Sequence, residues 1–386
     1  MISRRLPPQL QPNALARAVA AVRASGAQIA DLTASNPTST GIAYPDDLLA
    51  PLADRAALRY EPHPFGLPAA RAAVAADHAR RGVSVDPAHV VLTASTSEAY
   101  SWLFKLLCDA GDSVLVPRPS YPLFEHLTAL ESVSAQPYDL EYHGRWSIEM
   151  ASLVAAPERT RAVLAVSPNN PTGSYLSVEE LAALTQLCRD RRWALVVDEV
   201  FADYPLDASE PLTDIAARSE VLTFSLAGLS KSVGLPQLKL AWIVAGGPAD
   251  ARDEALTALE LVADSYLSVA TPVQVAVPHL LRAGASVRAA VHQRIRQNLD
   301  ALRAATRGFP ACDVLRTEGG WSAVVRVPAT RREETLVVDL LEHEHILVHP
   351  GYFFDFPREA YLVVSLLPPS AGFADACARL LRFVSG

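Results

Sequence analysis

The sequence predicts an α/β protein, with a mainly parallel sheet covered by helices on both faces and a smaller α+β domain. Between about residues 90 and 245, short apolar runs alternate with stretches of helical period, which is typical of βα crossovers. The last hundred residues follow a different pattern, a long helix and then mixed short strands and helices. A chain of 386 residues is long enough for two such domains.

The first region contains the strands that we expect to form the main sheet. We predict strands at 90–92, 113–116, 161–166, 193–197, 221–224 and 240–245. Helices are predicted between them at 97–107, 121–131 and 177–190. Because helical crossovers join neighbouring strands in parallel, the carboxyl ends of these strands should share one edge of the sheet.

The second region predicts the smaller domain. Its expected elements are helices at 285–306, at 333–343 and at the C-terminus, with strands at 321–327, 346–348 and 361–366. An N-terminal arm and an amphipathic helix after Pro12 precede the main domain. We therefore predict three parts: 1–46, contributing to the small domain; 47–284, the large domain; and 285–386, the small domain.

Composition limits the classes of function. A net charge of −8 and a pI near 5.7 argue against sequence-blind nucleic-acid binding, which normally requires a basic surface. The sequence offers no apolar stretch long enough for a bilayer and no signal-type segment, so a cytoplasmic protein is expected. The four cysteines are widely scattered without metal-ligand spacing, which favours reduced thiols and no metal site.

Lysine is rare in this chain, because only three of its 34 basic residues are lysines. Lys231 lies in a loop between Gly228 and Gly234, after the strand predicted at 221–224. This is the edge where α/β enzymes bind their ligands. Burial, or a second cation such as Lys239, would lower the pKa of Lys231 and make it a nucleophile. A surface lysine in a glycine-containing loop is the alternative interpretation.

Two further polar residues follow predicted strands. Asn170 belongs to a rigid Asn-Pro-rich turn after the strand at 161–166, where it either serves the turn alone or donates to a ligand oxygen. Asp198 closes the apolar strand at 193–197. It is either a cap or salt-bridge partner, or a partner for a protonated ring nitrogen in a dry site.

The segments after the first two strands offer a phosphate site and an aromatic residue. Ser95, Thr96 and Ser97 begin a predicted helix, where they either cap its N-terminus or bind a phosphate. Tyr121 follows the next strand and is either a core residue or a stacking partner for a planar cofactor. The specific signal is the order of these residues, since each follows a strand of one sheet.

Together these residues resemble the class I/II aminotransferases, which are fold-type I pyridoxal-phosphate-dependent enzymes. The resemblance covers most of the chain. Asn170 and Asp198 are 28 residues apart, which is also the spacing in that family. The matching positions are Tyr60, Gly66 and Arg71, the Asn-Asn-Pro-Thr-Gly stretch at 169–173, Asp198-Glu199-Val200, and Ser230-Lys231.

The resemblance implies a role for each residue. Lys231 would bind pyridoxal phosphate as a Schiff base and shuttle the α-proton, while Asp198 would pair with the ring nitrogen. Asn170 would bond the 3′-oxygen, and Tyr121 would stack on the ring. The phosphate would be bound by Ser95, Thr96, Ser97 and Lys239, and by Tyr60 of the neighbouring subunit. The protein would therefore be a homodimer with shared sites, transferring nitrogen from an amino acid to a 2-oxo acid.

Four positions depart from the family pattern. Phe201 replaces a tyrosine three residues after the aspartate, Gly228 replaces a hydroxyl residue, and Lys239 replaces the phosphate arginine. Val363 occupies the place of the arginine that binds the substrate carboxylate. Arg326 and Arg358 are the candidates to replace that arginine, or the substrate binds without a carboxylate fork.

Two other functions compete with transamination. The first keeps the cofactor and changes the reaction to β-elimination or decarboxylation, because the reaction type depends on which Cα bond stands perpendicular to the ring. The second is a ligand-binding homologue without catalysis, against which Lys231, Asp198 and Asn170 argue. An apolar mouth is expected from Phe201 and from the aromatic residues at 352–354.

Overall fold

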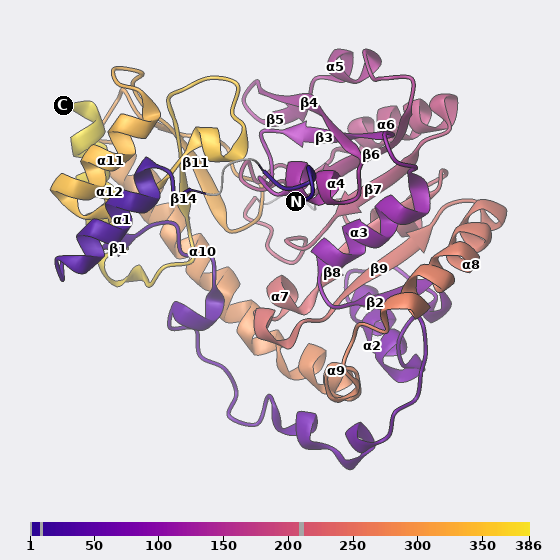
Figure 1. The fold of residues 1–386 in the computed structure, drawn as a ribbon. Coiled ribbons are helices and arrows are strands. Elements are labelled where there is room, and N and C mark those ends of the chain that lie inside the picture. Colours follow the sequence, from indigo (N-terminus) through magenta and orange to yellow (C-terminus); the bar gives the residue numbers. More distant parts are fainter. Residues whose placement is uncertain (1, 8–10, 208–211) are drawn as a thin grey trace.

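The largest feature of the computed structural model, which describes residues 2–7, 11–207 and 212–386, is an eight-stranded sheet (Figure 1). The order of the strands differs from their order in the chain, so several connections cross over the sheet. In spatial order the strands are β2 (Val90–Thr93), β9 (Ala241–Gly246), β8 (Thr223–Gly228), β7 (Ala194–Asp198), β6 (Thr160–Val166), β3 (Ser113–Arg118), β4 (Ser134–Tyr142) and β5 (Trp146–Ile148).

The sheet is mainly parallel, which confirms the predicted fold class. Strands β8, β7, β6, β3 and β4 form a continuous parallel series. Strand β9 runs antiparallel to both of its neighbours, β8 and β2, and β5 runs antiparallel to β4. The link from β8 to β9 contains only short helical turns, including α7 (Leu229–Ser232). It lacks the long helix of a parallel crossover, so the chain reverses direction there.

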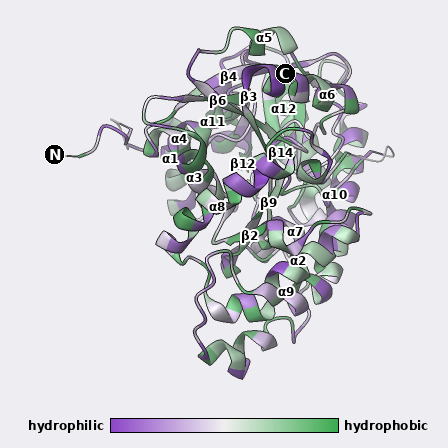
Figure 2. Cartoon of the chain, turned by 90° about the vertical axis from the view of Figure 1, so that its right-hand side faces the viewer, coloured by the Kyte–Doolittle hydropathy of each residue, from purple (hydrophilic) through white to green (hydrophobic). Residues whose placement is uncertain are grey.

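Helices cover both faces of the sheet, and alternate strand residues point to opposite cores. In β6, Ala162 and Leu164 belong to one buried cluster and Val163 belongs to another. The first face is covered by α3 (Thr96–Leu107), α4 (Phe124–Leu130) and α8 (Ala249–Tyr266). The second is covered by α2 (Pro68–Ala79), α5 (Met150–Val154), α6 (Val178–Arg191) and α9 (Thr271–Ala283). Figure 2 shows hydrophobic and hydrophilic residues mixed along these outer helices, as one-sided burial requires.

The C-terminal region forms a second, four-stranded antiparallel sheet, on the opposite side of Figure 1 from the large sheet. Its strands, in spatial order, are β10 (Asp313–Val314), β11 (Ser322–Arg326), β14 (Tyr361–Ser365) and β13 (His349–Pro350). The N-terminal segment joins this region, because β1 (Ala30–Asp31) pairs with β12 (Ile346–Leu347). Helix α1 (Ala14–Ala24) packs on α11 (Glu333–Glu344), and α10 (Ala285–Thr306) packs on α12 (Ser370–Ser385).

The predicted elements agree with the structure best where the apolar pattern is regular. The helix predicted at 285–306 is α10 with the same bounds. The helix predicted at 121–131 begins only at Phe124, because Pro122 interrupts its start. Strand β4 was not predicted, since its sequence, SAQPYDLEY, contains a proline and several polar residues. None of the described helices combines the length and apolar character that a membrane span requires.

Gly246, at the end of β9, provides a test of the fold. A Cβ atom at this position would lie 1.8 Å from the carbonyl oxygen of Ala216, so backbone would have to move to accommodate it. We expect Gly246→Ala to lower the free energy of unfolding by at least about 2 kcal/mol. Denaturant unfolding would measure this, with Gly308→Ala as the control, because a Cβ there lies 3.9 Å from its nearest neighbour. Equal losses in the two variants would contradict the expectation.

Candidate active site

The candidate site lies along one edge of the large sheet. Residues Thr93 of β2 and Gly228 of β8 both pair with Ala241, the first residue of β9. The turn after Thr93 and the Lys231 loop therefore lie two strand spacings apart, about 10 Å. Because β9 runs antiparallel, its start lies at the edge where β2 and β8 end, and Lys239 precedes that start by two residues. The three segments face one region of space.

Lys231 projects from α7 between two aromatic rings. Its Nζ atom lies 5.3 Å from the ring centroid of Phe201 and 4.8 Å from that of Trp321. Burial lowers the pKa of Lys231 to about 8, and the nearby Asp198 carboxylate opposes this effect. Of the two causes considered from the sequence, the structure supports desolvation, and Lys239 does not contribute to the shift. Lys231 thus has the environment of a nucleophilic lysine.

Asp198 ends β7 and is only 7% exposed. Its Oδ2 accepts a hydrogen bond from the Tyr100 hydroxyl at 3.1 Å, and its Oδ1 accepts one from the Val200 amide at 3.0 Å. Burial raises the pKa of Asp198 to about 6, while these two donors and Lys231 lower it. Within the described part of the chain, no basic side chain forms a direct ion pair with this carboxylate. A buried carboxylate is costly without a cation, so a protonated ring nitrogen would suit this position.

The two asparagines after β6 have different environments. Asn169 is buried, and its Nδ2 donates to the Pro119 carbonyl at 3.0 Å and to the Thr172 hydroxyl at 2.9 Å. Its Oδ1 accepts from the Ser120 hydroxyl at 2.6 Å, which joins the loops after β3 and β6. Asn170 is only half-buried. Asn169 therefore builds the turn, whereas the Asn170 side chain is partly accessible to solvent.

The N-terminus of α3 carries the predicted phosphate residues. The Ser95 hydroxyl accepts a hydrogen bond from the Glu98 amide at 3.1 Å, so Ser95 acts as the helix cap. Thr96 and Ser97 occupy the first turn and are half-buried. The amides and hydroxyls of such a turn suit an anion. Helix capping and phosphate binding are therefore compatible at this N-terminus. In this structure Ser95 caps the helix.

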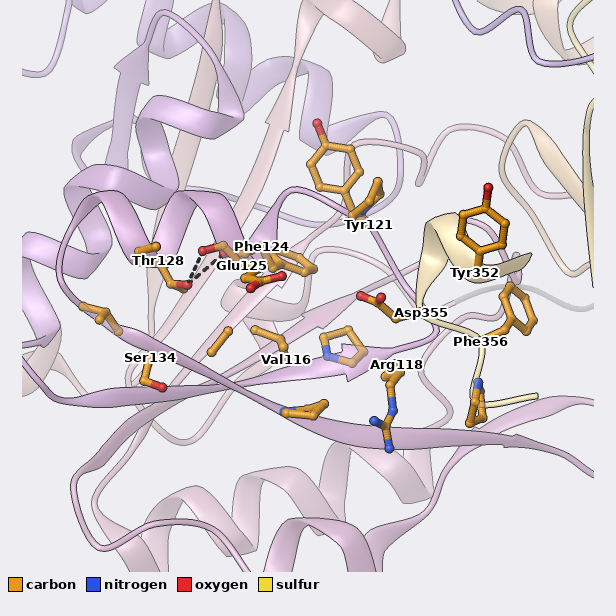
Figure 3. A pocket seen from close by; sticks show the side chains of 17 residues that line it. Val116, Arg118, Tyr121, Phe124, Glu125, Thr128, Ser134, Tyr352, Asp355 and Phe356 are labelled. Atoms are coloured by element: carbon orange, nitrogen blue, oxygen red, sulfur yellow. Dashed lines mark hydrogen bonds between the residues drawn. The ribbon is translucent and has the colours of Figure 1, made fainter. Parts of the chain in front are cut away.

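Tyr121 borders a cavity of about 640 Å³ between β3, α4 and the segment 352–357. Figure 3 shows Tyr121, Tyr352 and Phe356 at one end of it and Thr128 and Ser134 at the other. Burial raises the pKa of Tyr121, and Asp198 adds to the effect, so the two residues are close enough to interact electrostatically. Tyr121 thus borders this cavity and lies within electrostatic range of Asp198.

Two predicted phosphate residues stand apart from the buried group. Tyr60 is 67% exposed, and the side chain of Lys239 is also exposed. Lys239 caps a short turn with a left-handed φ of 50°. These side chains are available to a ligand or to a second subunit. The structure therefore brings Lys231, Asp198 and Tyr121 together, and it leaves Tyr60 and Lys239 at the surface.

The structure gives physical reasons for two of the family departures. A Cβ at Gly228 would lie 2.8 Å from the Cβ of Ala241, so the hydroxyl residue of the family would not fit. Phe201 packs edge-on against Trp321, with ring centroids 5.4 Å apart, and so shares the apolar surroundings of Lys231. Both departures keep the site tight and apolar around the lysine.

The position of the carboxylate-binding arginine is apolar. Val363 is 1% exposed and pairs with Val324 on the adjacent strand β11. Arg326 is exposed and forms an ion pair with Asp313 at 3.1 Å. Along the extended chain, Arg326 is about 16 Å from Trp321. Arg358 is also exposed, in the loop before β14. Both candidate arginines are therefore surface residues, and Arg326 already pairs with an acidic side chain.

Two residues near the centre were not predicted as site residues. Trp321 was seen only as the start of a strand, although its ring is within 5 Å of the Lys231 amine. Tyr100 was included only in the predicted helix at 97–107. Tyr100 follows Thr96 by four residues, so the two side chains lie on one face of α3. This spacing is the sequence feature that could have indicated Tyr100 as a site residue.

Within the described part of the chain, several polar groups of the site have no hydrogen-bond or ion-pair partner, and these groups can be compared with those of a cofactor. The Ser232 hydroxyl, next to Lys231, and the indole N–H of Trp321 are buried without a hydrogen-bond partner among the residues that the structure describes. Buried groups of this kind normally have partners. Among the described residues Asp198 likewise has no ion-pair partner, and the amides and hydroxyls of the first turn of α3 suit an anion. A planar cofactor with a cationic ring nitrogen and a phosphate therefore fits the residues present.

Comparisons with known proteins agree with this geometry. The family model for aminotransferase class I and II matches residues 43–380. The chain is similar to the alanine aminotransferase of Mycobacterium tuberculosis, with 28% identity over 95% of this chain and 87% of the relative. It is 24% identical to the glutamate-pyruvate aminotransferase of Escherichia coli, over 94% and 91% of the two chains. The fold is that of the alanine aminotransferase structure from Pyrococcus furiosus, with a TM-score of 0.90, 22% identity, and coverage of 100% and 99%.

Fold and site together define an α/β enzyme with a lysine of lowered pKa at the carboxyl edge of its sheet. The chain belongs to the class I and II aminotransferases. It is a pyridoxal-phosphate-dependent aminotransferase that acts on an amino acid and a 2-oxo acid. The comparisons do not favour the β-lyase or decarboxylase alternative.

Proposed function

We propose that Lys231 is the residue that carries the cofactor and moves the proton at the substrate Cα. The observation that carries this proposal is the position of its amine between the rings of Phe201 and Trp321, within electrostatic range of Asp198. With a pKa of about 8, roughly a tenth of the Lys231 amines are neutral at pH 7. At the ordinary value of 10.5, the fraction would be about 0.03%. Lys231 is thus prepared for both attack and proton transfer.

The other site residues hold the cofactor in this proposal. Bound pyridoxal phosphate supplies an electron sink for the charge that develops at the substrate Cα. Asp198 holds the protonated ring nitrogen, because a buried ion pair favours the charged form of both partners. The roles proposed for the rest are Asn170 at the 3′-oxygen, Tyr121 against the ring, and Ser95, Thr96, Ser97 and Lys239 at the phosphate.

The lowered pKa of Lys231 predicts how cofactor attachment depends on pH. The neutral amine is the nucleophile, so the rate of attachment to the apoenzyme should rise with pH and level off above about 8. Stopped-flow absorbance after mixing apoenzyme with pyridoxal phosphate, between pH 6 and pH 10, would measure this profile. A rate that continues to rise toward pH 10.5 would show that Lys231 is not desolvated.

Substrate choice can be tested with an amino-donor screen on the holoenzyme. The names of the relatives suggest alanine and glutamate as first donors, with pyruvate as an acceptor. We expect a donor to change the visible absorbance of the bound cofactor, and the matching 2-oxo acid to restore it. An absorbance that no amine donor changes would contradict an active aminotransferase and would support a non-catalytic homologue.

A homodimer with shared sites is part of the proposal, and the exposure of Tyr60 supports it. If Tyr60 completes the phosphate site of the partner, Tyr60→Ala and Lys231→Ala subunits should complement one another. A mixed dimer then contains one site with both native residues and one with neither. We expect the mixture to regain about a quarter of the wild-type activity after subunit exchange, since half of the dimers are mixed. No recovery in confirmed mixed dimers would exclude sharing through Tyr60.

The proposed domain organisation follows the sheets. Residues 47–284 would form the large cofactor-binding domain, and 285–386 the small one. The pairing of β1 with β12 supports the assignment of 1–46 to the small domain. Limited proteolysis that releases a stable fragment with other ends would contradict these boundaries.

A further inference from the structure

Helix α3 extends from the predicted phosphate site to the side of Asp198. Its first residues, Thr96 and Ser97, are at the carboxyl edge of the sheet, and Tyr100 follows one turn later. Tyr100 lies on the buried face of the helix and is 1% exposed. One rigid helix thus carries residues for both ends of the cofactor site.

The hydroxyl of Tyr100 completes the surroundings of the Asp198 carboxylate. It donates to Oδ2 at 3.1 Å, while the Val200 amide donates to Oδ1 at 3.0 Å. Each carboxylate oxygen therefore has one fixed donor, which sets the plane of the group. The ring of Tyr100 is held by Phe104, with centroids 6.0 Å apart, and by Phe124 at 5.4 Å. The donor is therefore held in place before any ligand binds.

The direction of this hydrogen bond is set by the protonation of Tyr100. Burial and the adjacent Asp198 carboxylate raise the pKa of Tyr100 well above its usual value, so the phenol stays protonated. The other titratable groups that influence this pair are Lys231 from α7, Tyr121 after β3 and Tyr138 from β4. Of these, only Lys231 is a cation, and it does not bond Asp198 directly. Tyr100 is thus the side-chain donor that favours the ionised form of Asp198.

We propose that Tyr100 is a positioning residue that keeps Asp198 ionised and aimed at the ring nitrogen of the cofactor. This inference rests on the proposed pairing of Asp198 with that nitrogen. Without the hydroxyl, the ionised carboxylate of Asp198 loses one of its two hydrogen-bond donors. The effect of burial on its pKa is then less opposed, so Asp198 takes up a proton at a higher pH. A protonated Asp198 cannot hold a cationic ring nitrogen, so cofactor affinity and turnover both decrease.

The test is Tyr100→Phe, which removes one oxygen and leaves the ring between Phe104 and Phe124. In the holoenzyme we expect the acidic limb of the kcat profile to move up by about one pH unit. We also expect about tenfold weaker cofactor binding by equilibrium dialysis. The matched control is Tyr138→Phe, because Tyr138 is equally buried and its hydroxyl donates to the Leu164 carbonyl at 2.8 Å. This control should lose stability without either change.

A double-mutant cycle separates positioning from general destabilisation. If Tyr100 acts through the Asp198 charge, Tyr100→Phe should change cofactor affinity less than twofold in an Asp198→Asn background. An equal effect in both backgrounds, or a Tyr100→Phe profile identical to that of Tyr138→Phe, would overturn the proposed role of Tyr100. The proposed function would fail separately, if Lys231→Ala still bound the cofactor covalently or Asp198→Asn kept full affinity.

Discussion

Replacing Lys231 by alanine is expected to reduce kcat by at least about 10⁴-fold, because in the proposed mechanism this one side chain both attaches the cofactor and moves the Cα proton. Lys231→Arg should be nearly as inactive, since arginine keeps the positive charge but does not lose a proton near neutral pH. Loss of activity should be accompanied by loss of covalent cofactor, which absorbance would report directly. The two variants together separate the charge of Lys231 from its chemistry.

The rarity of lysine makes the control for this experiment unusually clean. Lys105 binds Glu131 and the Ser101 hydroxyl on the outside of α3, so Lys105→Ala should retain activity. Borohydride reduction of the holoenzyme followed by peptide mapping should place the label on Lys231. A label on Lys105 or Lys239 would contradict the assignment, whatever the activities of the variants.

The sequence was sufficient to propose this residue because strand ends are visible in the apolar pattern. Lys231 and Asp198 each follow an apolar run, and parallel strands bring such positions to one edge. The reversed direction of β9 was not predicted, although it places Lys239 at that same edge. Edge positions can therefore be predicted without knowing the order or direction of every strand.

Contacts between distant elements could not be predicted in this way. The ring of Trp321 reaches Lys231 from the second sheet, 90 residues away in the chain, and no local pattern indicates that contact. The two neighbouring asparagines also differ in burial, since the side chain of Asn169 is buried and bonded within the turn and Asn170 is only half-buried. The low pKa of Lys231 likewise results from the packing around its amine. The spacing of Lys231 and Lys239 in the sequence does not reveal that packing.

Asp198→Asn is expected to change activity and stability in opposite directions. Loss of the charge that holds the ring nitrogen should lower kcat by about 10³-fold and weaken cofactor binding, as for a broken buried ion pair. The apoenzyme, however, should become more stable at neutral pH. The pKa of Asp198 is about 6 in the folded protein and 3.8 for an ordinary aspartate, which we take as the unfolded value. The folded state therefore loses stability as the pH rises from 3.8 to about 6. Above pH 6 the loss is constant, at about 3 kcal/mol, and an amide does not incur it.

Asp112 provides the matched control, because it is another buried carboxylate but has cationic partners. It bonds Arg159 and Arg161 at 2.8 and 2.7 Å, just before β3, at the sheet edge opposite the site. Those partners hold its pKa well below the usual value, so Asp112→Asn should destabilise the protein and leave cofactor affinity unchanged. Denaturant unfolding of both apoproteins at pH 5 and pH 8 would test the opposite signs. If Asp198→Asn were destabilising at pH 8, Asp198 would already have a stabilising partner, and its availability to a cofactor would be in doubt.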